Sequence, residues 1–175
     1  YHSPGMGFVT NTEGGTAETL FLIDAKTKPT PYTRTCIELG RLNLGGMKVT
    51  TVGEVLEDVR KHWVIFSELT GTGKGELYAL FSGLDLNKSP LFVLRLNKET
   101  GKKLKRWDLP KPKGQLRGTA VAHWGRRIFV FVSTTSTNQV VTLDLETGKS
   151  SVLLPSTPYQ VEGAGVSTCA PWVIK

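Results

Sequence analysis

Short runs in which apolar and polar residues alternate recur along the chain, and turn-forming residues separate them. The phrase VLRLNKETGK at 93–102 returns as VTLDLETGK at 141–149, so that Asn97 and Asp144 lie 47 residues apart. Looser copies lie at 22–28 and 42–48. Alternation with a period of two places every second side chain on one face of a β-strand. The pattern therefore predicts pairs of antiparallel strands joined by tight turns.

The residues inside these turns favour the same structure. An Asp or Asn side chain accepts hydrogen bonds from backbone groups that follow it, and this starts a turn. Asn97 and Asp144 occupy that place, and each is followed four residues later by a glycine, Gly101 or Gly148. Glycine adopts the positive φ that such a turn needs before the second strand begins. Both phrases therefore predict hairpins.

A glycine-containing segment that leads into an apolar strand precedes each hairpin, at 5–23, 70–81 and 122–131, and a similar segment lies at 161–167. A β-propeller blade has four antiparallel strands in about 40 to 45 residues. We therefore predict an all-β fold of antiparallel, four-stranded, blade-like repeats, about three units plus a fragment. The predicted units are 5–56, 66–109 and 118–155, with a closing strand at 159–171, all in a single domain over 1–175.

The number of units raises the question of closure, because propellers usually have about four to eight blades. Three explanations are open: several subunits assemble one ring, the chain is part of a larger propeller, or the sheets pack as a sandwich. An unpaired sheet edge invites association. We therefore expect self-association.

Composition is that of a globular β-protein. Hydrophobic residues make up 39% and charged residues 21% of the 175 residues, and no apolar run reaches the length of a membrane-spanning helix. The 19 glycines and 9 prolines argue against a helical bundle. We expect no transmembrane segment.

Positive charge is concentrated in one part of the sequence. The chain has a formal charge of +7, whereas residues 98–127 alone contain ten basic and two acidic residues. A local excess of this kind predicts contact with a polyanion such as an acidic glycan, and the alternative is a solvated hairpin. The candidate ligand-binding residues are Lys102, Lys103, Lys105, Arg106, Arg117, Trp124, Arg126 and Arg127. They match no nucleic-acid recognition motif, so specific recognition of nucleic acid is not expected.

Two cysteines, Cys36 and Cys169, lie 133 residues apart. One interpretation is a disulfide that ties the last segment to the first unit, which would indicate an oxidising compartment. The alternative is two reduced thiols.

Three phrases are similar to sequences of secreted, propeller-like lipoproteins of the myxobacterial type: NTEGGTAETLF at 11–21, ELTGTGKGELYALF at 68–81 and GAGVSTCAP at 163–171. The resemblance extends over about Gly7 to Pro171. It implies a repeated all-β fold and a secreted, periplasmic or outer-envelope location, but no assigned chemistry. No lipid-attachment cysteine lies near Tyr1.

No set of residues predicts catalysis. The segment 71–75 lacks the first glycine and the hydroxyl residue of a phosphate-binding loop. His2, His62 and His123 have no metal-ligand spacing. A propeller hydrolase would gather acidic ligands such as Glu68, Asp85, Asp144 and Glu162, and nothing in the sequence brings these together. We expect no metal and no cofactor.

The sequence thus predicts a non-catalytic, extracytoplasmic binding module for acidic glycan or another envelope component. The alternatives are a structural protein that homo-oligomerises through its sheet edges and, third, a small hydrolase with a site in the channel.

Overall fold

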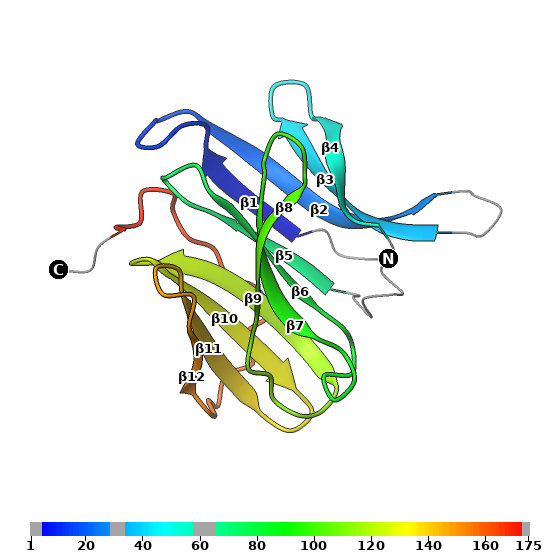
Figure 1. Ribbon diagram of the computed structural model, residues 1–175, viewed down its shortest axis with the longest axis vertical. Helices are drawn as coiled ribbons and strands as arrows, with labels where there is room; N and C mark the ends of the chain where they lie inside the picture. Colours follow the sequence, from blue (N-terminus) through cyan, green and yellow to red (C-terminus); the bar gives the residue numbers. More distant parts are fainter. Residues whose placement is uncertain (1–4, 29–33, 58–65, 173–175) are drawn as a thin grey trace.

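The computed structural model describes residues 5–28, 34–57 and 66–172, and these form three four-stranded antiparallel sheets (Figure 1). Sheet 1 contains β1 (Gly5–Thr10), β2 (Glu18–Lys28), β3 (Arg34–Asn43) and β4 (Lys48–Leu56). Sheet 2 contains β5 (Phe66–Gly71), β6 (Leu77–Ser82), β7 (Leu91–Leu96) and β8 (Lys103–Asp108). Sheet 3 contains β9 (Leu116–Trp124), β10 (Arg127–Thr134), β11 (Asn138–Asp144) and β12 (Ser150–Leu154).

Each sheet is a meander, in which every strand pairs with the next strand of the sequence. The described residues contain no helix, and therefore none that is long and apolar enough to cross a membrane. The predicted all-β fold of blade-like, four-stranded antiparallel repeats is confirmed. The three sheets do not close into a ring (Figure 1).

The prediction of a closing strand at 159–171 is wrong. That segment forms no strand, and its contacts hold it in an irregular path across the molecule. The Val161 amide donates to Ser133 Oγ at 3.3 Å, and the Gly125 amide donates to the Pro171 carbonyl at 3.0 Å. Between them, Thr168 donates to the carboxylate of Glu18. Two side-chain acceptors, Ser133 and Glu18, and one loop donor, Gly125, replace the neighbouring strand that a closing strand would need.

Two cores lie between the sheets. Phe21, Ile23 and Leu39 of sheet 1 pack against Phe81 and Phe92 of sheet 2. The opposite face of sheet 2 carries a second set of buried residues, which packs against sheet 3: Tyr78, Leu80, Val93 and Trp107 of sheet 2, with Ile128, Val130 and Val141 of sheet 3. Sheet 2 is therefore buried on both faces, whereas sheets 1 and 3 are each buried on one.

The first strands of the three sheets lie next to one another. The Thr10 amide, at the end of β1, donates to the carbonyl of Thr72 after β5, at 3.4 Å, and β5 also contacts β9. These strands have the position of the innermost strands of propeller blades, and β4, β8 and β12 are then the outermost strands.

The repeated turns have the predicted chemistry. Asn97 Oδ1 accepts from the amides of Glu99 and Thr100 at 2.9 and 3.0 Å. Asp144 Oδ1 accepts from the amides of Glu146 and Thr147 at 3.0 and 2.8 Å. The glycines that follow, Gly101 and Gly148, have φ of 73° and 72°. One local sequence thus builds the same hairpin in sheets 2 and 3.

Candidate functional site

The structure divides the predicted basic surface between two different places. Lys102, Lys103, Lys105 and Arg106 lie in and just before β8, the outermost strand of sheet 2, and all four are exposed. Arg117 and Trp124 lie at opposite ends of β9, the innermost strand of sheet 3. Arg126 lies in the turn that follows, and Arg127 is the first residue of β10. These residues are close in sequence, but they lie on the outermost strand of one sheet and the innermost strand of the next, and the width of a sheet separates these two positions.

Carboxylates neutralise the arginines of the β9–β10 turn. Arg126 Nη1 lies 3.0 Å from Glu146 Oε2, and Arg127 Nε lies 3.9 Å from Asp144 Oδ2. Arg126 also has a φ of 64°, so this residue serves the geometry of a tight hairpin. These two cations are therefore part of the turn.

The cations of β8 are different, because most of them have no acidic partner. Among the described residues, Lys102 and Lys103 form no ion pair, and Lys105 lies over the ring of Trp107, with its Nζ 4.8 Å from the ring centre. Arg106 is paired with Asp108 at 2.6 Å, and its guanidinium lies 3.9 Å from the centre of the Phe92 ring.

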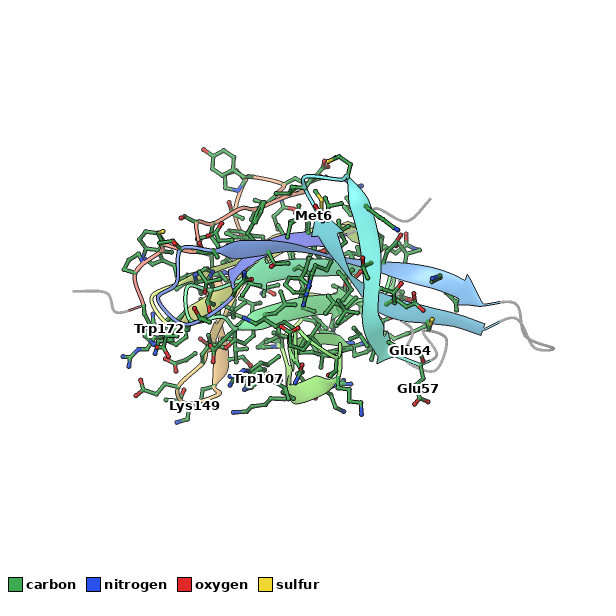
Figure 2. All side chains as sticks on the ribbon, turned by 90° about the horizontal axis from the view of Figure 1, so that it is seen from above. Met6, Glu54, Glu57, Trp107, Lys149 and Trp172 are labelled. Atoms are coloured by element: carbon green, nitrogen blue, oxygen red, sulfur yellow. The ribbon has the colours of Figure 1, made fainter. Side chains whose placement is uncertain are left out.

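The turn between β11 and β12 adds one more lysine to this place. Ser150 Oγ lies 3.5 Å from the carbonyl oxygen of Asp108, so the turn contacts the end of β8. Figure 2 shows Lys149 of this turn on the same side of the molecule as Trp107. We call Lys102, Lys103, Lys105, Arg106 and Lys149 the basic edge.

The tryptophans provide few open aromatic surfaces. Trp107 is buried behind the basic edge, and its Nε1 finds no hydrogen-bond partner among the residues that the structure describes. Trp124 is 46% exposed, and the ring of Trp172 is covered by Lys74, whose Nζ lies 4.6 Å from the ring centre. Trp63 and Tyr32 lie outside the described residues.

The predicted disulfide between Cys36 and Cys169 is not formed, and both cysteines keep their thiols. Cys36 pairs with Lys26 in the β2–β3 ladder, whereas the neighbour of Cys169, Thr168, bonds to Glu18. Eight residues of β2 separate these two points, about 26 Å at about 3.3 Å per residue. A disulfide requires Cα atoms within about 7 Å. The cysteines thus lie at opposite ends of sheet 1.

A cluster that the sequence analysis missed surrounds Cys36. One ligand atom each of Cys36, Glu38 and Glu54 lies within 4.8 Å of the others. Cys36 and Glu38 alternate along β3, and Glu54 is the partner of Glu38 on β4, so the alternation could have suggested two of the three. A thiol and two carboxylates are ligands that zinc accepts, but Lys26 Nζ lies 3.0 Å from Glu38 Oε2 and compensates part of the charge.

The carboxylates considered for a hydrolase lie on separate elements. Glu68 is in β5, Asp85 in the link from β6 to β7, Asp144 at the end of β11, and Glu162 in the C-terminal segment. Burial raises the pKa of Glu68 to about 7 and lowers the pKa of His123, which is buried and whose Nδ1 has no partner within 5–28, 34–57 and 66–172. His2 and His62 lie outside the described residues. The described residues therefore do not assemble these groups into one catalytic site.

Two hollows lie near the innermost strands. A cavity of about 200 Å³ is lined by Met6 and Phe8 of β1, Val121 of β9 and the segment 164–166. A larger one, about 450 Å³, lies where the β1–β2 and β5–β6 turns meet Thr168, Cys169 and Trp172. Lys74 pairs with Glu13 at 3.5 Å in this second hollow.

Comparison with protein-family models and with curated proteins finds no match. A crystal structure of a protein of unknown function from Dyadobacter fermentans has the same fold, with a TM-score of 0.56 and 13% sequence identity. The match covers 83% of this chain and 42% of that chain, so this chain spans less than half of the neighbour's length. At this identity the likeness concerns the fold alone. The resemblance to secreted, propeller-like lipoproteins stays a prediction.

Proposed function

We propose that this protein is a non-catalytic, extracytoplasmic binding module that holds a polyanion, an acidic glycan of the envelope, against its basic edge. The observation that carries the proposal is the pair of exposed lysines on β8, Lys103 and Lys105, for which the described part of the chain supplies no acidic partner. The arginines of the β9–β10 turn, by contrast, are paired with Glu146 and Asp144.

The arrangement of the basic edge suits an extended, charged polymer. Residues two apart on a strand are spaced by about 6.6 Å, and Lys103 and Lys105 lie this far apart on either side of a register shift in β8, so they supply closely spaced charge along the edge. Lys149 extends this charge onto sheet 3. Because these ammonium groups are solvated, the contact is electrostatic and its strength depends on salt.

Acidic glycan is favoured over nucleic acid by the position of the aromatic residue. Binding of single-stranded nucleic acid relies on bases stacked on exposed rings. The ring of Trp107 is 8% exposed and already covered by Lys105. A polymer recognised by its charge alone fits this surface.

The test compares two variants that carry the same change of charge. In the first, Lys102, Lys103 and Lys105 are replaced by Glu. In the control, Lys48, Lys88 and Lys113 are replaced, which are exposed lysines outside the basic edge. Binding of a heparin oligosaccharide is measured by calorimetry over a range of salt concentrations. We expect the first variant to lose about tenfold or more in affinity, with a shallower salt dependence, and the control to lose far less.

Equal losses in both variants would mean that only net charge matters, and the proposal would fail. Single-stranded DNA of matched charge is the second probe. If the protein bound this DNA more tightly than heparin, nucleic acid rather than acidic glycan would be the preferred ligand.

A further inference from the structure

The stack of three sheets ends on two partly apolar faces that no other sheet covers, one at each end. In sheet 2, Leu77, Ala79 and Phe81 face sheet 1, while Tyr78 and Leu80 face sheet 3, and each of these side chains is at most 2% exposed. Sheet 1 has no sheet before it and sheet 3 has none after it (Figure 1). The faces of sheets 1 and 3 that correspond to the two buried faces of sheet 2 are therefore open to another sheet, except where the C-terminal segment lies against sheet 3 at Ser133, which accepts from the Val161 amide.

The open face of sheet 1 carries the side chains that alternate with its core residues. Val9, Phe21 and Ile23 point toward sheet 2, so Met6, Phe8, Leu20 and Leu22 lie on the other face, and Asp24 and Lys26 continue that face at the far end of β2. Met6 is 57% and Phe8 41% exposed, and Val49 of β4 is 52% exposed. The segment 164–166 lines a cavity with Met6 and Phe8 but leaves both of them exposed.

The open face of sheet 3 is built in the same way. Ile128, Val130 and Val132 point toward sheet 2, so Phe129 and Phe131 lie on the opposite face, where they are half-buried. Leu154, whose ladder partner is Val140, is 47% exposed. This face corresponds to the one that carries Tyr78 and Leu80 in sheet 2.

The two open faces are counterparts of each other. The open face of sheet 1 corresponds to the face of sheet 2 that packs on the sheet before it. The open face of sheet 3 corresponds to the face of sheet 2 that packs on the sheet after it. We infer that the occupant is a second copy of this chain, with sheet 3 of each copy packed on sheet 1 of the other. Two copies related by a two-fold axis form both contacts at once. The six sheets then close a ring within the usual range of about four to eight blades.

This arrangement continues a contact that the chain already makes twice, between sheets 1 and 2 and between sheets 2 and 3. It differs from pairing through sheet edges, because β8, the outer edge of sheet 2, is rich in lysine and therefore resists strand addition. It does not depend on the proposed binding of an acidic glycan and is tested without any polyanion.

The experiment measures mass by light scattering after size exclusion, across a dilution series. The wild type is expected to have twice the mass of the chain. The tail variant, Met6→Lys with Phe8→Lys, changes the open face of sheet 1. The head variant, Phe129→Asp with Leu154→Asp, changes the open face of sheet 3. Each variant is expected to be monomeric. An equimolar mixture of the two is expected to recover the dimer, because it has one unaltered interface and one in which Lys faces Asp.

The control is Leu104→Asp, at a side chain 56% exposed on β8 and remote from both open faces, which should keep the dimer. If the double head variant does not fold, Leu154→Asp alone takes its place, because Leu154 is exposed. A wild type that is monomeric throughout, a mixture that stays monomeric, or an assembly larger than two chains overturns the inference. Any of these results would mean that something other than a single second copy covers the two faces.

Discussion

Glu68 and His123 lie on innermost strands, and burial shifts the pKa of each of them. Burial disfavours the charged form of either group, so it raises the pKa of Glu68 to about 7 and lowers that of His123. Their effects on stability are opposite in sign. Protonation of His123 in the unfolded chain weakens the fold below about pH 6.5, whereas ionisation of Glu68 in the unfolded chain weakens it above about pH 4.5.

Replacing Glu68 by Gln is expected to remove the second effect. The wild-type carboxyl keeps its proton to about pH 7 when folded and loses it near pH 4.5 when unfolded, so the unfolded state gains free energy over that window. At pH 8 the variant should be more stable by about 1 kcal/mol, once the solvent screening of a partly exposed group is allowed for. At pH 4 this advantage should vanish. Urea unfolding at both pH values measures it, with Glu57→Gln as the control for the loss of one exposed carboxylate.

The two cysteines should differ in reactivity because they differ in burial. Cys36 is completely buried and donates to the Lys26 carbonyl at 3.5 Å, whereas Cys169 is exposed. A thiol reagent is expected to modify Cys169 in the native protein and Cys36 only after unfolding. Counting modified sites by mass spectrometry with and without denaturant tests this. Protection of both cysteines in denaturant, lost on reduction, would instead indicate the disulfide.

Among the elements, the hairpins were the most predictable, because their determinants are local. Asn97 and Gly101, like Asp144 and Gly148, lie within a few residues of the backbone groups that they order. The basic surface was less predictable. Neighbours in sequence such as Arg106 and Arg117 fall on the last strand of one sheet and the first of the next, and only the sheet order separates them.

Contacts between elements also depend on glycines that no turn requires. A Cβ atom on Gly53 of β4 would lie 2.1 Å from the Thr100 carbonyl oxygen, where sheet 1 touches the β7–β8 turn of sheet 2. Gly53→Ala is expected to destabilise the protein by about 2 kcal/mol, because backbone must move on both sides. Gly46→Ala is the matched control, since nothing lies within 4 Å of its Cβ position, and it should change stability by less than about 0.5 kcal/mol. Equal effects in denaturant unfolding would show that the sheets do not pack this closely.

At the scale of the whole molecule, the stacking of sheets followed from the repeat, whereas the path of the C-terminal segment did not. The segment 163–167 has the glycine-rich sequence of an innermost strand, but no hairpin partner follows it in the described residues. The residues on either side of it, Val161, Thr168 and Pro171, bond to Ser133, Glu18 and Gly125, which are far away in sequence. No local pattern encodes such contacts.

Shortening the chain after Thr157 should therefore weaken the fold without removing the sheets. The cut deletes the hydrogen bonds of Val161, Thr168 and Pro171, each worth about 1 kcal/mol, while the segment regains conformational entropy. We expect a net loss of about 2 kcal/mol and an unchanged β-sheet circular dichroism spectrum. The Gly125 amide, which donates to Pro171, should exchange with solvent faster. If the shorter chain lost the β-sheet signal, the C-terminal segment would be essential to the core. The three sheets would then not form by stacking alone.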